Sequence, residues 1–156
     1  MVLLDATLTQ LELTTAQRRL ARHYRIGPAR RGYDDPSYLY RVKAFDGNGL
    51  RPYAPVHLHL TGALGDDIAA SWIRRSRIEG DSWDLEEIPL GEAQEAYRIR
   101  ILRGETVLRE LIVSTAYWTY TASAQSADGA MADDLFEVAQ LSDRYGAGFA
   151  ARRGLG

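Results

Sequence analysis

The chain has 156 residues, of which 46% are hydrophobic and 26% are charged, and its formal net charge is −2. This length and composition suit one folded domain, or one domain with part of another, and argue against wholesale disorder. The sequence contains no cysteine, which excludes disulfides, thiolate metal sites and thiol nucleophiles. No apolar run approaches the roughly 20 residues of a membrane-spanning helix, so we expect no membrane span.

Charge is distributed unevenly along the chain. Residues 1–55 carry nine Lys and Arg against five acids, whereas residues 56–156 carry ten Arg against sixteen acids. A basic first third could contact nucleic acid or an acidic partner. Nucleic-acid binding would require a dense Lys/Arg stripe with interleaved aromatic residues, which this sequence lacks. We therefore expect solvated strand surfaces and no nucleic-acid partner.

The first fifty residues predict a small β-rich segment. Apolar and polar residues alternate over 3–13 and 38–45 as they do in strands. Residues 15–25 fit either a Thr-capped helix or a turn followed by a strand that ends near Ile26, and the thin apolar face of the helix favours the strand. Because the segment has few apolar positions for a core, we expect residues 1–52 to form the end of a preceding domain.

A turn-rich stretch and two prolines mark the end of this segment. Residues 46–49 read Asp-Gly-Asn-Gly, which predicts a glycine-rich hairpin turn after the strand at 38–45. Pro52 and Pro55 follow. Proline fixes φ and removes a backbone donor, so this stretch is expected to be extended and to lie between sheets. We place a domain boundary here, with residues 53–156 forming the second domain.

From Val56 onward the chain repeats the period-two pattern of half-buried strands, separated by turn signals rich in Gly and Asp. Each such strand has one apolar face, so two sheets must bury those faces together. About one hundred residues with roughly seven short strands predict an all-β, immunoglobulin-like antiparallel sandwich. The predicted strands span 56–60, 68–72, 97–101, 107–113, 117–124 and 135–141, and the expected core residues are Trp72, Tyr97, Ile99, Ile101 and Val138.

The residues that could carry catalysis are few and form no known pattern. His57 and His59 lie two apart on a strand and could clamp a metal from one face, but a zinc site needs a third and usually a fourth ligand, so we expect solvent-facing histidines. Adjacent carboxylates lie in turn-like stretches rather than at facing positions across a substrate. The sequence has no P-loop, G-x-S-x-G or dinucleotide-binding motif. We therefore expect no catalytic residue, no cofactor, no bound metal and no enzymatic activity.

Two segments carry residue types that are typical of contact surfaces. Arg74, Arg75 and Arg77 follow a predicted strand, and Trp83 comes a few residues later. Arg and Trp are enriched at interface hot spots, which makes these four residues a candidate interface. The alternative is an Arg-rich strand end with Trp83 folded over the edge of the sandwich. The aromatic run at 117–120 could form a sugar-stacking platform, although strand spacing puts half of its rings in the core.

With its strands placed, residues 55–156 resemble a fibronectin type III domain. The pattern consists of a proline before the first strand, Trp72 in the second, an aromatic-x-Ile-x-Ile third strand at 97–101 and a late strand at 136–138. Phe136 stands where such domains usually carry a tyrosine whose hydroxyl bonds back to the backbone. Phenylalanine has no hydroxyl, so this departure counts against a tyrosine corner.

Further runs resemble the C-terminal end of the large baseplate hub protein of gene transfer agents and related siphophage-like tails. The most specific are Trp-Ile-Arg-Arg-Ser-Arg at 72–77 and Ile-Pro-Leu-Gly-Glu at 88–92, and the others lie at 49–58, 80–83 and 138–142. The resemblance covers nearly the whole chain. The proteins of that family are far longer, so the chain matches only their last part.

The resemblance implies a structural role. Such hub proteins are thought to trimerise at the tip of the tail, to close its channel and to contact the host envelope. The expected partners are therefore other baseplate or tail subunits, with a homotrimer in the intact assembly, and the expected location is the tail tip of a virion or gene-transfer-agent particle. A glycan- or receptor-binding module on the host-facing tip is one alternative. A cell-wall hydrolase that uses His57 and His59 is another.

Overall fold

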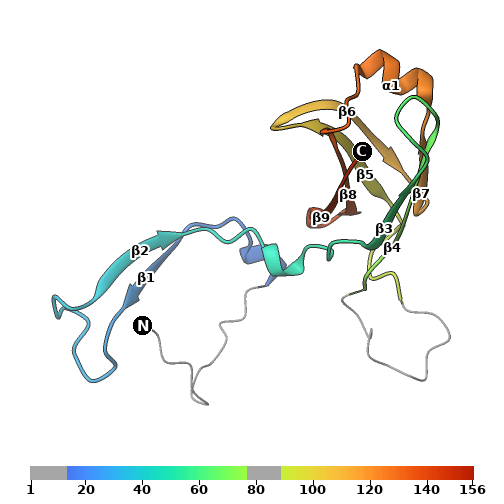
Figure 1. The fold of residues 1–156 in the computed structure, drawn as a ribbon. Helices are drawn as coiled ribbons and strands as arrows, with labels where there is room; N and C mark the ends of the chain where they lie inside the picture. The colour runs from blue at the N-terminus through green and yellow to red at the C-terminus, as the bar shows by residue number, and fades with distance from the viewer. Residues whose placement is uncertain (1–13, 77–88) are drawn as a thin grey trace. The chain divides into compact units, whose positions relative to one another are not determined.

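The computed structural model describes residues 14–76 and 89–156 (Figure 1). The chain divides into two compact units, Met1–Asn48 and Gly49–Gly156. The strand expected at 3–13 lies outside the described residues. Within the described part of the chain, no helix is long and apolar enough to cross a membrane.

The first unit contains one antiparallel hairpin. A 3-10 turn, η1 (Thr15–Gln17), precedes β1 (Arg22–Ile26), which pairs along its whole length with β2 (Leu39–Lys43). The predicted turn followed by a strand that ends near Ile26 is confirmed, and β2 lies inside the strand predicted at 38–45. No described residue of this unit is buried. We call residues 22–45 the arm.

The second unit is a sandwich of two antiparallel sheets. One sheet has the order β3-β4-β7, and the other has the order β6-β5-β8-β9. All six strands predicted from residue 56 onward are present (Figure 1). The strand bounds are β3 (Val56–Thr61), β4 (Ile68–Ile73), β5 (Tyr97–Arg103), β6 (Thr106–Val113), β7 (Tyr117–Tyr120), β8 (Leu135–Ser142) and β9 (Gly146–Gly154).

Two local predictions are wrong, and one strand was not predicted. The strand predicted at 117–124 ends at Tyr120, because the Thr121 side chain accepts a hydrogen bond from the Ala124 N–H and starts the helix α1 (Ala122–Asp128). The last strand predicted from the sequence, at 135–141, is followed by a further strand, β9, which pairs with β8. The turn at 46–49 makes no hairpin with the following strand, since β2 pairs with β1; it leads into the 3-10 turn η2 (Asn48–Leu50).

The core lies between the two sheets. Trp72 on β4 is 4% exposed, and its ring contacts Tyr97 of the opposite sheet edge to face, with centroids 5.2 Å apart. The β5 residues Ile99 and Ile101 and the β8 residue Val138 are fully buried in the same cluster. All five core residues named from the sequence therefore lie in the layer between the sheets.

Residues 49–52 pack with the sandwich. Pro52 is buried, and its carbonyl accepts a hydrogen bond of 3.1 Å from the Phe149 N–H of β9. Gly148 permits this approach, because a Cβ there would lie 2.4 Å from the Pro52 carbonyl oxygen. The segment before β3 is thereby fixed to the last strand of the fold.

Replacing Gly148 with alanine is therefore expected to lower the free energy of unfolding by about 1–3 kcal/mol, the usual cost of overpacking. Gly154→Ala is the matched control on the same strand, since its Cβ would meet its nearest neighbour at 3.6 Å. Urea denaturation of the two variants compares them directly. Equal stability of both variants would contradict the close contact between Pro52 and β9.

Candidate interaction surface

A cleft lies at the end of the sandwich where three loops meet. It has a volume of about 650 Å³ and is open to solvent. The lead-in segment before β3, the segment before β5 and the turn between β8 and β9 form its walls. We call it the loop-end cleft, and its lining residues are Gly49, Leu50, Tyr53, Gly91, Glu92, Ala93, Asp143, Arg144 and Tyr145.

Short-range hydrogen bonds shape the walls of the cleft. The Ser142 hydroxyl at the end of β8 accepts from the N–H groups of Arg144 at 3.3 Å and Tyr145 at 3.2 Å. This side chain holds the β8–β9 turn, a role that Ser often has in turns. The Leu141 N–H donates to the Ala96 carbonyl at 2.8 Å and ties the second wall to β8.

The structure brings two residues of the predicted interface to the rim of this cleft. The Arg75 guanidinium carbon lies 4.9 Å from the centroid of the Tyr53 ring, which is a cation–π contact. The Arg74 guanidinium donates to the Pro89 carbonyl at 3.3 Å. Arg75 is exposed and Arg74 is half-buried. The other two members of the predicted interface, Arg77 and Trp83, lie outside the described residues.

The lining of the cleft suits recognition of a partner. Tyr53 and Tyr145 supply aromatic faces, and Glu92, Asp143 and Arg144 supply charges of both signs. Among the described residues, the lining contains no Ser, Thr, Cys, Lys or His.

A buried tyrosine lies close to the same end of the sandwich. The Tyr97 hydroxyl donates to Glu95 at 2.6 Å. Burial, together with this carboxylate, raises the pKa of Tyr97 above its usual range. The hydroxyl is therefore protonated at neutral pH and acts as a hydrogen-bond donor that anchors the segment before β5.

The histidines lie away from this cleft, on β3. His57 and His59 are both exposed and alternate with half-buried Val56, Leu58 and Leu60. His57 has a left-handed φ of 50°, at an irregularity in the pairing of β3 with β4. In the described part of the chain, no group of three His, Asp or Glu side chains is placed to hold a metal ion.

The aromatic run at 117–120 presents one exposed ring. Tyr120 is fully buried, and Trp118 stacks on it with centroids 5.4 Å apart. Trp118 also packs against Phe136 in the core. Tyr117 is 53% exposed, and its hydroxyl bonds to Thr119. As the strand spacing predicted, the run is divided between core and surface, and it forms no platform of several rings.

Charges on the outer face of the larger sheet neutralise one another. Glu110, Arg100, Glu137 and Arg152 lie in one row across β6, β5, β8 and β9. Arg100 contacts Glu110 at 2.5 Å, and Arg152 contacts Glu137 at 2.7 Å. Because these four charges alternate in sign, the row leaves no net charge to attract a partner.

The sheet order decides the fold family of the second unit. Three strands face four, with β4 and β7 paired in one sheet and β5 flanked by β6 and β8 in the other. The fold is fibronectin type III-like.

The chain is similar in structure to domains d3–d4 of the rat CD45 extracellular region, with 10% identity, a TM-score of 0.48, and coverage of 99% of this chain and 72% of that one. It is also similar to the FN5 domain of Drosophila Lar, with 18% identity, a TM-score of 0.34, and coverage of 66% and 95%. No protein-family model and no curated protein matches the sequence.

Sequence reasoning missed the two tyrosines of the cleft. Tyr53 lies between two prolines, and Tyr145 lies in the turn between two strands. Aromatic residues in loops have no strand face to fill, and loops carry binding residues disproportionately. That position outside the strands is the signal that could have found them.

Proposed function

We propose that this protein is a non-enzymatic structural module of a phage-like tail tip of the gene transfer agent type, and that it acts through protein–protein contacts in the baseplate. The observation that carries the proposal concerns the Trp-Ile-Arg-Arg-Ser-Arg run at 72–77, one of the most specific parts of the resemblance. This run contributes both to the core of the sandwich and to its surface. Trp72 of the Trp-Ile-Arg-Arg-Ser-Arg run is buried in the core, whereas Arg75 is exposed at the rim of the loop-end cleft. The same short segment therefore stabilises the sandwich and supplies residues for a contact.

The chemistry of the rim supports a protein partner. Arg, Tyr and Trp carry much of the binding energy of protein interfaces, and the rim combines Arg75 with Tyr53. In this proposal the partners are other subunits of the baseplate, the intact assembly is a homotrimer, and the particle carries the domain at its tail tip.

A second candidate function is recognition of a host glycan or receptor. Exposed Tyr53 and half-buried Tyr145 favour it, because aromatic faces that line a cleft can stack on sugar rings. Glu92, Asp143 and Arg144 can bond the hydroxyl groups of a sugar. Binding of the full chain to a glycan array, lost in Tyr53→Ala and kept in Tyr117→Ala, would favour this function over the structural one.

We expect Arg75→Glu to lower incorporation of the protein into tail particles by about tenfold, since reversal of a rim charge places like charges against the partner. Mass spectrometry of purified particles measures the incorporated fraction. Arg153→Glu is the matched control, because it makes the same change of charge at the far end of β9, where Arg153 bonds the Leu58 carbonyl. Absence of the parent protein from the particles, or labelling in the capsid or host cytoplasm, would overturn the proposal.

A further inference from the structure

The arm exposes far more apolar surface than a free hairpin tolerates. None of its residues is buried, and six of its large hydrophobic side chains are between 46% and 75% exposed. An isolated two-stranded hairpin is marginally stable in water, and contiguous exposed apolar patches mark interaction sites. The exposed large hydrophobic residues of the arm are Ile26, Tyr33, Leu39, Tyr40, Val42 and Phe45. The arm therefore requires a partner.

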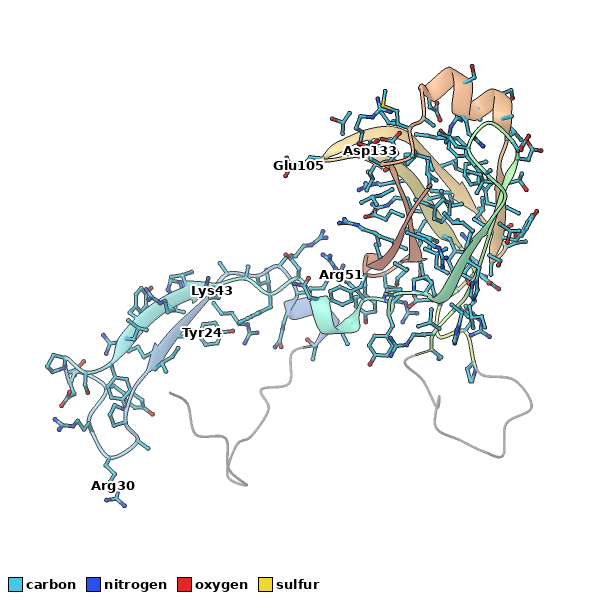
Figure 2. All side chains as sticks on the ribbon, viewed as in Figure 1. Tyr24, Arg30, Lys43, Arg51, Glu105 and Asp133 are labelled. Atoms are coloured by element: carbon cyan, nitrogen blue, oxygen red, sulfur yellow. The ribbon has the colours of Figure 1, made fainter. Side chains whose placement is uncertain are left out.

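The charge of the arm indicates the chemistry of that partner. Its 24 residues carry six Lys and Arg and two Asp, and neither strand has an acid. Arg22 lies directly opposite Lys43, and Arg41 follows on the same face opposite Tyr24. Figure 2 labels Lys43 and Tyr24 on the two strands of the arm. Like charges opposite each other destabilise a strand pair, so an acidic surface laid on this face would relieve the repulsion.

The same face also carries apolar groups. Ile26 pairs with Leu39, and the Phe45 ring packs edge to face on Tyr24 with centroids 5.9 Å apart. Aliphatic groups gain little from a phosphate backbone but gain from an apolar groove. The face therefore favours a protein surface that is apolar at its centre and acidic at its rim over nucleic acid.

The sandwich has a groove of that kind. A hollow of about 360 Å³ lies between the β3–β4 loop and α1, and its lining includes Leu64, Ala122 and Ala130. The Gln125 side chain fixes the groove in shape, because it accepts from the Gly65 N–H at 2.9 Å and donates to the Asp66 carbonyl at 2.6 Å. A preformed groove costs little to occupy.

The rim of this groove is acidic. Asp66 and Asp67 are exposed on the β3–β4 loop. The arginines beside α1 are already committed, since Arg109 bonds Asp128 at 2.6 Å and 2.9 Å and Arg103 bonds Asp134 at 2.8 Å through two nitrogens. The Asp67 carboxylate accepts a hydrogen bond from the Ala122 N–H at 2.9 Å, which leaves Asp66 as the rim carboxylate best placed to attract a cation.

From this complementarity we propose that the arm of one copy docks on the groove of a second copy, with apolar side chains of the Tyr24 face in the groove and Arg41 and Lys43 beside Asp66. The groove follows the end of β3, whereas Pro52 fixes the chain before β3 begins, about 20 Å away along a six-residue strand. To reach the groove of its own chain, the arm would have to fold back along β3. Docking on the groove of a neighbouring copy does not require this. Such a contact joins different surfaces of the two copies and generates a ring or a filament.

Sedimentation of the full chain over a wide concentration range tests this proposal, which does not depend on the tail-tip function. We expect concentration-dependent association that weakens at high salt. Arg41→Glu and Asp66→Arg are each expected to weaken association about tenfold, and the double variant to regain most of it, because exchanged charges again attract.

Arg153→Glu is the matched control, since it makes the same change of charge at an exposed residue of β9 that lines neither the groove nor the loop-end cleft. It should associate as the parent does. A chain that is monomeric at every concentration would overturn the proposal. So would an Arg153→Glu effect as large as that of Arg41→Glu, or arm-dependent binding of a DNA duplex by a monomer.

Discussion

Replacing Trp72 with alanine is expected to lower the free energy of unfolding by about 3–5 kcal/mol, the usual cost of deleting a buried tryptophan side chain. Trp72 is 4% exposed, and it contacts Tyr97 at 5.2 Å and Phe136 at 6.2 Å between ring centroids. Both partners belong to the opposite sheet. Alanine would leave a cavity in the layer that joins the two sheets, so the loss should appear as a lower urea midpoint in circular dichroism.

Tyr117→Ala is the control for this experiment. Tyr117 is also an aromatic residue of the smaller sheet, but it is 53% exposed, so its loss should change the free energy of unfolding by about 0.5 kcal/mol or less. A Trp72→Ala variant that unfolds at the parental urea concentration would show that the ring does not fill the core. The strand register of β4 would then be wrong.

The strands of the sandwich were predictable because one face of each strand packs in the core and the other faces solvent. Along β5, Tyr97, Ile99 and Ile101 are buried, whereas Arg98 and Arg100 on the outer face are half-exposed. Apolar and polar residues alternate along such a strand because its side chains are alternately buried and exposed, so the strand can be predicted from a single sequence. The same reasoning identified Trp72, since Ile68, Ala70 and Trp72 share the buried face of β4.

The elements that sequence reasoning missed lack this alternation of apolar and polar residues. β9 contains glycines, alanines, arginines and one phenylalanine, and it buries none of its residues, so its sequence has no apolar alternation to detect. Gly148 is small because the Pro52 backbone approaches it, which is a contact between residues far apart in the sequence. The helix α1 follows an aromatic strand, and the capping by Thr121 outweighed the β-forming residues before it.

The candidate site was predictable only in part. Composition pointed to Arg74 and Arg75, but it could not reveal that Tyr53 lies under Arg75 or that Tyr145 lines the same cleft. Three loops separated by many residues build that cleft, and the sheet pairing that assembles them is not local. The groove beside α1 was invisible for the same reason, since it depends on Gln125 reaching the β3–β4 loop.

The second large effect is expected at Asp134, whose side chain is fully buried. The carboxylate accepts from Arg103 at 2.8 Å through each oxygen and from the Met131 N–H at 2.8 Å. Asp134→Asn keeps the volume but removes the charge that pairs with Arg103. Arg103 is 37% exposed, so water partly compensates it when its partner is lost, and we expect the free energy of unfolding to fall by about 1–3 kcal/mol at neutral pH.

Asp133→Asn is the matched control. Asp133 is the preceding residue and is exposed, so the same change of charge should alter the free energy of unfolding by about 0.5 kcal/mol or less. Urea denaturation at neutral pH separates the two variants. Equal stability of Asp134→Asn and Asp133→Asn would mean that the buried pair contributes nothing beyond a surface charge.

The pH dependence of the stability difference between the parent and Asp134→Asn distinguishes loss of the ion pair from a purely steric effect, because a steric effect would not vary with pH. The Arg103 hydrogen bonds outweigh burial and hold the pKa of Asp134 below its ordinary value of 3.8. A carboxylate whose pKa is lower in the folded state stabilises the protein above the unfolded pKa, and this contribution disappears as the pH falls through the folded value. The difference in stability between the parent and Asp134→Asn should therefore be full at neutral pH and shrink progressively below about pH 4. A difference that stays constant down to the acid unfolding transition would show that the ionised pair is not its cause.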